Sequence, residues 1–425
     1  FSSDVDLTGD RTVFWDAAEG TLNGVDLDHD DAVEWSRSDV MVASDPATTM
    51  GHNVTLTPEA GARSYSVGGD MPGPNSWYLH DEKLVSPEGA AEAYSYDLTF
   101  PSRGEVPAGS VRRVADSSLA EVANRYASQG PVPPSLAERS DAWKDVERGI
   151  WWGRTREQAV PGERTEYFTP GGWTSFLTLR DEGSGEPSER RVELAAGRSA
   201  RTWNSAPLDV GLDPNFPAFA HEGDHFFFRA GMFDTAEREQ FADSGAGERY
   251  TGTSVVLADG AEIFRQEESV CNGFGAPLAA DFDGTVTVRC DAVRDVSWSA
   301  LGKAASAEWT FAVRPGERVP AASGIRLSAS GVVDGYAPAR LPQIVALEVY
   351  EQTGAAAAKT GSLTFEVSYD EGKTWKKVPV YAGGDHAVAV LRHPAGATSV
   401  STRMSAADEA GNTVTQTMIR SYGLK

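Results

Sequence analysis

The chain has 425 residues, with 62 Asp and Glu against 38 Lys and Arg, so its formal net charge is −24. This length is too great for one β-sandwich and suggests about three domains. So acidic a surface repels phosphate backbones and anionic lipid, which argues against nucleic acid and membranes as partners. The sequence contains no run of about 18 apolar residues, so we expect no membrane-spanning helix.

The first half of the chain is predicted to form a β domain followed by a short helix. Residues 1–115 alternate short apolar runs with Gly, Asp and Pro turns, which predicts an N-terminal β domain. A helix and a Pro-rich connector are expected in 116–135, because Asp116 or Ser117 can cap apolar residues that recur at helical spacing as far as Gly130.

The second half is predicted to contain two further β domains. Period-two alternation with many aromatic residues resumes in 136–316 and predicts a central β-sandwich. A boundary rich in Pro and Gly leads to 317–425, expected to be an immunoglobulin-like domain. The predicted fold class is therefore all-β: tandem antiparallel β-sandwich modules with one short helix and a C-terminal immunoglobulin-like domain.

One hairpin of the last domain has the pattern of an Asp-box. In the segment 368–375, Asp370 is expected to cap its own turn, and Gly372 supplies the conformational freedom that the turn requires. Trp375 is expected to anchor the hairpin in the core.

The only two cysteines, Cys271 and Cys290, each border a strand-like run. A single pair in an otherwise cysteine-free chain is best interpreted as one disulfide formed in an oxidising compartment. Two unrelated buried thiols are the alternative. The disulfide interpretation favours a secreted, extracellular protein.

His221, Glu222 and His225 spell the H-E-x-x-H string of zinc proteases. That chemistry requires a helix, since only helical spacing brings both histidines to one face beside the glutamate. Gly223 and Asp224 between them are instead a turn signal. A hairpin is therefore expected here, with the zinc site as a weak alternative.

Two further strings resemble functional motifs. The run Gly252-Thr253-Ser254 is similar to the nucleophile tripeptide of subtilisins, but the apolar run after Ser254 predicts a strand. Asp26, Asp28 and Asp30 begin like a calcium-binding loop, yet they lack the later glycine and glutamate that such a loop needs. We expect a solvated acidic loop, with an incidental calcium site as the alternative.

The aromatic residues offer a possible binding platform. Trp151, Trp152 and Trp173 could line a surface for sugar or peptide, although aromatic residues at alternate positions of a β domain more often belong to the core.

Eight strand and turn segments occur together in a characteristic order: 96–98, 113–126, 164–171, 197–207, 309–311, 363–375, 391–396 and 408–423. Their joint order resembles the region that follows the catalytic domain of large secreted subtilisin-like serine proteases of actinobacteria. In that family the catalytic Asp, His and Ser precede this region. The resemblance therefore implies no catalytic residue in this chain.

The resemblance implies a non-catalytic accessory portion that braces the protease, or presents it to substrates or surfaces. The expected partner is a catalytic subtilisin-like domain or chain upstream of Phe1, with protein substrates or the cell wall as further candidates. The start at Phe1, within an alternating segment, suggests a processed product. No cofactor is expected, with calcium as the one alternative. The alternatives are a free-standing extracellular β-sandwich that binds polysaccharide or protein and, less favoured, the zinc metalloprotease.

Overall fold

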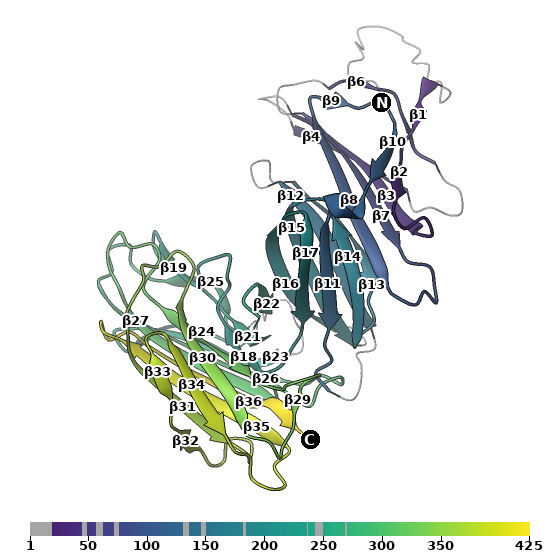
Figure 1. Cartoon of the computed structure of the whole chain (residues 1–425). Coiled ribbons are helices and arrows are strands. Elements are labelled where there is room, and N and C mark those ends of the chain that lie inside the picture. The colour runs from purple at the N-terminus through teal and green to yellow at the C-terminus, as the bar shows by residue number, and fades with distance from the viewer. Residues whose placement is uncertain are drawn as a thin grey trace.

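The computed structural model describes residues 19–44, 49–56, 63–71, 76–130, 136–145, 150–181, 184–235, 237–242, 250–267 and 270–425. These residues form β-strands joined by turns and loops, with the 3-10 turn η2 (Asp116–Ser118), and contain no α-helix. Figure 1 shows two β bodies, an N-terminal one in purple to teal and a C-terminal one in teal to yellow. The all-β prediction is confirmed.

The N-terminal body is built on two large sheets. The seven-stranded sheet has the order β17 (Gly197–Trp203), β11 (Ala120–Tyr126), β14 (Gly162–Phe168), β8 (Tyr94–Arg103), β7 (Trp77–Val85), β3 (Val33–Ser44) and β4 (Thr49–Leu56). The five-stranded sheet has the order β13 (Ile150–Glu157), β12 (Leu136–Asp145), β15 (Gly171–Asp181), β16 (Ser184–Leu194) and β22 (Gln240–Ala242).

Three small strand pairs complete the N-terminal body. They are β1 (Thr21–Leu22) with β5 (Tyr65–Ser66), β2 (Gly24–Leu27) with β10 (Val111–Val114), and β6 (Gly69–Asp70) with β9 (Glu105–Val106). Residues of both parities along β7 are buried from Trp77 to Leu84. Both faces of the seven-stranded sheet are therefore covered at β7.

The C-terminal body is a second sandwich of two sheets with smaller strands beside them. The larger sheet has the order β24 (Ala261–Gln266), β23 (Tyr250–Ala258), β26 (Gly284–Arg294), β27 (Ala304–Val313), β36 (Thr413–Leu424), β35 (Ser399–Asp408), β31 (Thr360–Ser368) and β32 (Lys376–Val378), with β29 (Tyr336–Ala337) also on β36. The smaller sheet has the order β28 (Ser323–Ala329), β30 (Gln343–Glu351), β34 (His386–Leu391) and β33 (Tyr381–Gly383). The remaining strands are β18 (Leu208–Gly211) with β21 (Gly231–Thr235), and β19 (Phe219–Glu222), β20 (His225–Arg229) and β25 (Asn272–Pro277).

Strict alternation explains the strands of the C-terminal body. In β26, Val286, Val288, Cys290 and Ala292 point inward, and the residues between them are half-buried or exposed. Such a period-two pattern buries one face of a sheet and solvates the other. The inward residues of both sheets join one large apolar cluster.

The helix expected from Asp116 or Ser117 to Gly130 is wrong, and the Pro-rich connector expected in 131–135 lies outside the described residues. After η2 the chain enters β11, which pairs antiparallel with β14 and parallel with β17. Val122 and Tyr126 are four residues apart, a spacing that satisfies both a helix and a strand. Asn124 between them and Ala120 before them are also buried, which gives a period of two, and sheet pairing on both sides fixes the strand.

The predicted domain boundaries do not coincide with the sheets. The seven-stranded sheet joins strands of 1–115 to β11, β14 and β17, and the larger C-terminal sheet joins β23, β24, β26 and β27 to strands of 317–425. Among the described residues, two bodies therefore replace the three modules expected from the sequence.

The two bodies meet through a buried polar contact. Arg294 of β26 is 3% exposed and donates to Glu186 of β16 at 2.7 Å and to Gln129 at 2.8 Å. Val296 and Trp298, which follow Arg294, pack in an apolar cluster with Trp203 of the N-terminal body. A buried, charge-assisted contact of this kind fixes one body against the other.

Candidate functional site

The H-E-x-x-H string forms the β19–β20 hairpin. His221 is paired with Phe226 and Glu222 with His225, so the two histidines lie on opposite faces of the hairpin. His221 is buried, whereas His225 is exposed and lies 2.6 Å from Asp224. Glu222 pairs with Arg318. The zinc-site hypothesis at His221, Glu222 and His225 is therefore wrong, because the two histidines cannot bind one ion.

The acidic loop with Asp26, Asp28 and Asp30 is organised by neighbouring residues. Asp28 forms an ion pair with Arg113 and accepts the backbone N–H of Asp116 at 2.9 Å. These contacts, the backbone hydrogen bond first, lower the pKa of Asp28. Asp30 is exposed. Within the ranges that the structure describes, no three His, Cys, Asp or Glu side chains are grouped so that they could hold a metal ion.

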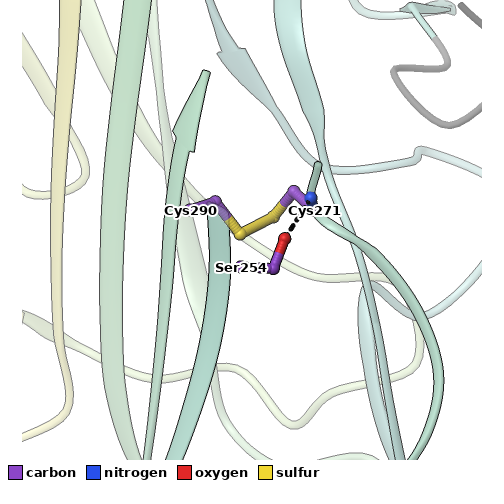
Figure 2. The surroundings of a disulfide bond; sticks show 3 residues. All are labelled: Ser254, Cys271 and Cys290. Carbon is purple, nitrogen blue, oxygen red and sulfur yellow. Dashed lines mark hydrogen bonds between the residues drawn. A yellow bond between two sulfur atoms is a disulfide. The ribbon is translucent and has the colours of Figure 1, made fainter. Parts of the chain in front are cut away.

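Ser254 lies beside the disulfide and has a structural role. Figure 2 shows Cys271 bonded to Cys290, as predicted, with Cα atoms 5.4 Å apart. Ser254 pairs with Cys290 across β23 and β26, and its hydroxyl accepts the backbone N–H of Cys271 at 2.7 Å. All three residues are fully buried. Ser254 is thus part of a strand, as expected from the residues that follow it.

The Asp-box hairpin has the predicted turn. Asp370 accepts the backbone N–H of Thr374 at 2.9 Å and its hydroxyl at 2.6 Å. Hydrogen bonds from Thr374 and Ser368 lower the pKa of Asp370 to about 2. Gly372 has a φ of 83°, which a side chain rarely adopts. Trp375, expected in the core, is only half-buried, with the Arg403 guanidinium 4.5 Å from its ring centroid.

Trp173 does not belong to an exposed aromatic platform. It is 1% exposed, and its indole N–H donates to the carbonyl oxygen of Thr169 at 2.8 Å. It packs edge-on against Phe168 in the core of the N-terminal body. The side chains of Trp151 and Trp152 lie outside the described residues.

Sequence reasoning missed a network of buried charges between the two large sheets of the N-terminal body. Glu166 is fully buried and accepts hydrogen bonds from Asn124 at 2.7 Å and Tyr126 at 2.5 Å. The guanidinium groups of Arg139 and Arg156 also bind its carboxylate. Burial alone would raise the pKa of Glu166, but the two arginines hold it down at about 2.

A second buried group extends this network along the sheet. Lys83 lies 2.7 Å from Asp97 and 3.8 Å from Asp81, and all three side chains are buried. Lys83 also donates to the carbonyl oxygen of Asp141 at 3.3 Å. Each cation in the network is held by more than one anion or carbonyl, which is the condition for burying charge without large loss of stability.

A pair of buried carboxyl groups in a small cleft of the C-terminal body was also not predicted from the sequence. Asp209 of β18 and Asp234 of β21 are register partners, and both are buried. One oxygen of Asp209 accepts the Val210 N–H at 2.8 Å, and its other oxygen has no hydrogen-bond partner. Burial raises the pKa of Asp209 to about 8 and that of Asp234 to about 7.

Paired carboxyls with raised pKa values are a common feature of acid–base sites. The empty volume of the cleft is ≈ 260 Å³, part of which is open to solvent. This volume is below the usual size of a small-molecule site. Asp234 accepts the backbone N–H groups of Thr235 at 2.8 Å and Ala242 at 3.2 Å. These contacts give the pair a role in joining β18, β21 and β22.

Comparison of the chain with protein-family models gave no match, and neither did comparison with curated proteins. None of the described helical segments is long and apolar enough to cross a membrane. The disulfide is compatible with an extracellular location.

Proposed function

We propose that this chain is a rigid, non-catalytic β scaffold and acts as the accessory portion of a secreted subtilisin-like serine protease. The proposal rests chiefly on the Arg294–Glu186–Gln129 contact, which joins the two bodies through buried groups. A scaffold that braces or positions another domain must keep its own parts in fixed geometry. A buried guanidinium of one body that binds a charged and a polar side chain of the other meets that requirement.

The roles of the candidate chemical residues agree with this proposal. Ser254 accepts a buried backbone N–H, and His221 and His225 face opposite sides of a hairpin. The assignment to a subtilisin-like protease depends on the order of the sequence segments. It therefore needs a test of its own.

The first test is a peptide map of the protein in its native source. We expect peptides upstream of Phe1 that continue into a subtilisin-like catalytic domain, or a separate catalytic chain that co-purifies. An unrelated sequence upstream of Phe1, with no associated protease, would contradict the assignment to a subtilisin-like protease.

The second test is an assay of the purified chain on casein. We expect no hydrolysis, and the Ser254→Ala and His221→Ala variants should be indistinguishable from the unmodified chain. Hydrolysis that either substitution abolished would contradict the non-catalytic role.

An extracellular binding protein is the second candidate function. It is favoured by an apolar sheet face in the C-terminal body, where Ile344, Val388 and Val390 are exposed. A chain that is secreted by itself and binds a defined polysaccharide or protein would support this candidate over the first.

A further inference from the structure

One buried cation of the N-terminal body differs in kind from the others. Among the residues that the structure describes, Lys83 of β7 is the only lysine that is buried. In the same part of the chain, the other buried side chains with a fixed positive charge are arginines: Arg37, Arg139, Arg190 and Arg294. Arginine suits a buried ion pair because it keeps its charge and forms forked hydrogen bonds, whereas lysine can lose its proton and become a nucleophile. A lysine at this position therefore indicates chemistry that a guanidinium cannot perform.

The fold holds Lys83 against the carboxyl group of Asp97. The two are register partners on β7 and β8, so their side chains lie on the same face of the sheet. The Lys83 Nζ lies 2.7 Å from Oδ1 of Asp97 and also donates to the carbonyl oxygen of Asp141 at 3.3 Å. A contact of this length places Nζ about 3.5 Å from Cγ of Asp97, a separation at which two fixed groups can react.

A second carboxyl group is positioned beside this pair. Asp81 lies two residues before Lys83 on β7, so it shares the same face of the sheet. Its Oδ1 is 3.8 Å from Nζ and accepts the hydroxyl of Thr99 at 3.0 Å. Burial raises the pKa of Asp81, so this carboxyl group can take up and release a proton.

The ion pair leaves polar atoms of the site without partners. Oδ2 of Asp81 and Oδ2 of Asp97 are buried and have no hydrogen-bond partner among the described residues. The ring of Trp173 lies 5.4 Å from Nζ and covers the site with an apolar surface. Buried charged oxygens without donors reduce stability. An amide between Lys83 and Asp97 would remove both charges of the pair and one of the two unpartnered oxygens.

We propose that Lys83 and Asp97 condense in the folded chain to form an isopeptide bond, which joins β7 and β8 covalently. The ammonium first passes one proton to the Asp97 carboxylate. The lone pair of Nζ then forms a bond to Cγ, and the electron pair of the C=O double bond moves to its oxygen. Asp81 accepts a proton from the nitrogen and passes it to the hydroxyl group of the intermediate. The C–O bond breaks, water leaves with the bonding electrons, and the carbonyl group forms again.

The reaction is balanced without an oxidant, a cofactor or a second substrate. One ammonium and one carboxylate give one amide and one water, and Asp81 ends in its starting state. Burial alone would lower the pKa of Lys83, but Asp81 and Asp97 raise it. The resting pair is therefore ionised, and the first proton transfer makes the reaction slow. The bond forms only after folding, because solvent separates the two side chains in the unfolded chain. The inference does not depend on the assignment to a protease.

Mass spectrometry of the intact chain tests the proposal. The chain is kept folded at neutral pH for several days, then unfolded with its disulfide reduced. We expect a mass about 18 Da below that of the sequence, because one water has been lost. Chymotrypsin cleaves after aromatic residues, and Tyr94 and Tyr96 lie between the two partners. The digest should therefore contain two peptides joined through Lys83 and Asp97. A mass equal to that of the sequence would overturn the proposal.

Variants identify the atoms that react. Lys83→Arg keeps the positive charge but cannot form the amide, so its mass should equal that of its sequence. Asp81→Asn removes the proton carrier and should slow the loss of water from freshly synthesised chain at least about 100-fold. The matched control is Lys359→Arg, because Lys359 lies 2.5 Å from Glu409 but both side chains are exposed. This control should lose about 18 Da like the unmodified chain.

The controls separate the isopeptide bond from other losses of water. Circular dichroism should show that each variant is folded. If Lys83→Arg does not fold, the joined peptides of the unmodified chain decide the question alone. A loss of water that persists in folded Lys83→Arg, or a digest without the joined peptides, would overturn the proposal. An unchanged rate in Asp81→Asn would overturn the role of Asp81 as the proton carrier.

Discussion

The interiors of the two bodies are filled by different kinds of side chain. The C-terminal body buries one continuous apolar cluster and adds a disulfide. In the N-terminal body the apolar residues fall into two smaller clusters and a third that also contains Val296 and Trp298 of the C-terminal body, and charged side chains fill the space around them. Two bodies with similar sheets can therefore be stabilised in different ways: one by burial of apolar side chains, the other by a connected set of buried ion pairs.

This difference predicts how each body responds to substitution. An apolar core loses stability in proportion to the volume removed. A buried ionic network depends on every member, since removing one leaves its partners charged and unpaired. The following experiments test that contrast, from the largest expected effect to the smallest.

Replacement of Glu166 by alanine should have the largest effect. It leaves Arg139 and Arg156 without their shared carboxylate, which should lower the free energy of unfolding by about 3–5 kcal/mol. Hydrogen exchange should accelerate in β11, β12 and β14 and remain slow in β26, β27 and β36. The control is Glu366→Ala, which removes an ion pair on an outer face and should cost about 0–1 kcal/mol. Equal losses in the two variants would refute the difference between the bodies.

Removal of the disulfide should have the next largest effect, and in the other body. The double variant Cys271→Ala and Cys290→Ala opens a link between positions 19 residues apart. In the chain-entropy model such a link contributes about 3 kcal/mol. We expect a lower denaturation midpoint for β23 to β27, measured by hydrogen exchange in urea, with little change in the N-terminal sheets. An unchanged midpoint would show that the disulfide does not stabilise the body.

The pH dependence of the C-terminal body should follow from Asp209 and Asp234. A carboxyl whose pKa is higher in the folded chain than in the unfolded one stabilises the fold while it is protonated. That contribution is complete below the ordinary pKa of 3.8 and is lost as the pH rises through the folded values of about 7 and about 8. The C-terminal body should therefore melt at a lower temperature at pH 8.5 than at pH 5.5.

Asp209→Asn sharpens this test. The amide has the shape of a protonated carboxyl but cannot ionise, so the variant should lose less stability than the unmodified chain between pH 5.5 and 8.5. Asp281→Asn is the control, because Asp281 is exposed in the turn before β26. An unaltered pH profile for Asp209→Asn would mean that Asp209 is already ionised in the fold.

Ser254→Ala should have the smallest effect. It leaves the buried N–H of Cys271 without an acceptor, which should lower the free energy of unfolding by about 1–2 kcal/mol. The control is Ser306→Ala, at a half-buried outward position of β27. Urea denaturation measures both. Similar results for the two serines would argue against the structural role assigned to Ser254.

Local features were predicted well from the sequence because they depend on neighbouring residues. The alternation in β26 and the turn at Asp370 are examples, and the disulfide followed from there being only two cysteines. The N-terminal charge network was not predicted, because it joins side chains of strands that are brought together only by the fold. In β7, however, Asp81 and Lys83 share the parity of the buried Leu79, and that parity was the available signal.

Features that depend on distant pairing were not predictable in the same way. The strand β11 was mistaken for a helix because the neighbours that fix it, β14 and β17, come later in the chain. The register of Asp209 with Asp234 likewise joins separate strands. The exposure of Trp375 depends on how Arg403 covers its ring, which no local pattern encodes.

The position of β36 has a consequence for biosynthesis. This strand comes after all the others in the sequence, yet it lies between β27 and β35 in the middle of its sheet. Its Gln416 also donates to the carbonyl oxygens of Val210 at 2.6 Å and Ile325 at 3.0 Å. Until 413–424 have been synthesised, β27 and β35 are two unpaired edges, each open to pairing with another chain. A nascent chain therefore needs protection from aggregation until translation has passed this point, and any truncation before it should be removed by proteolysis.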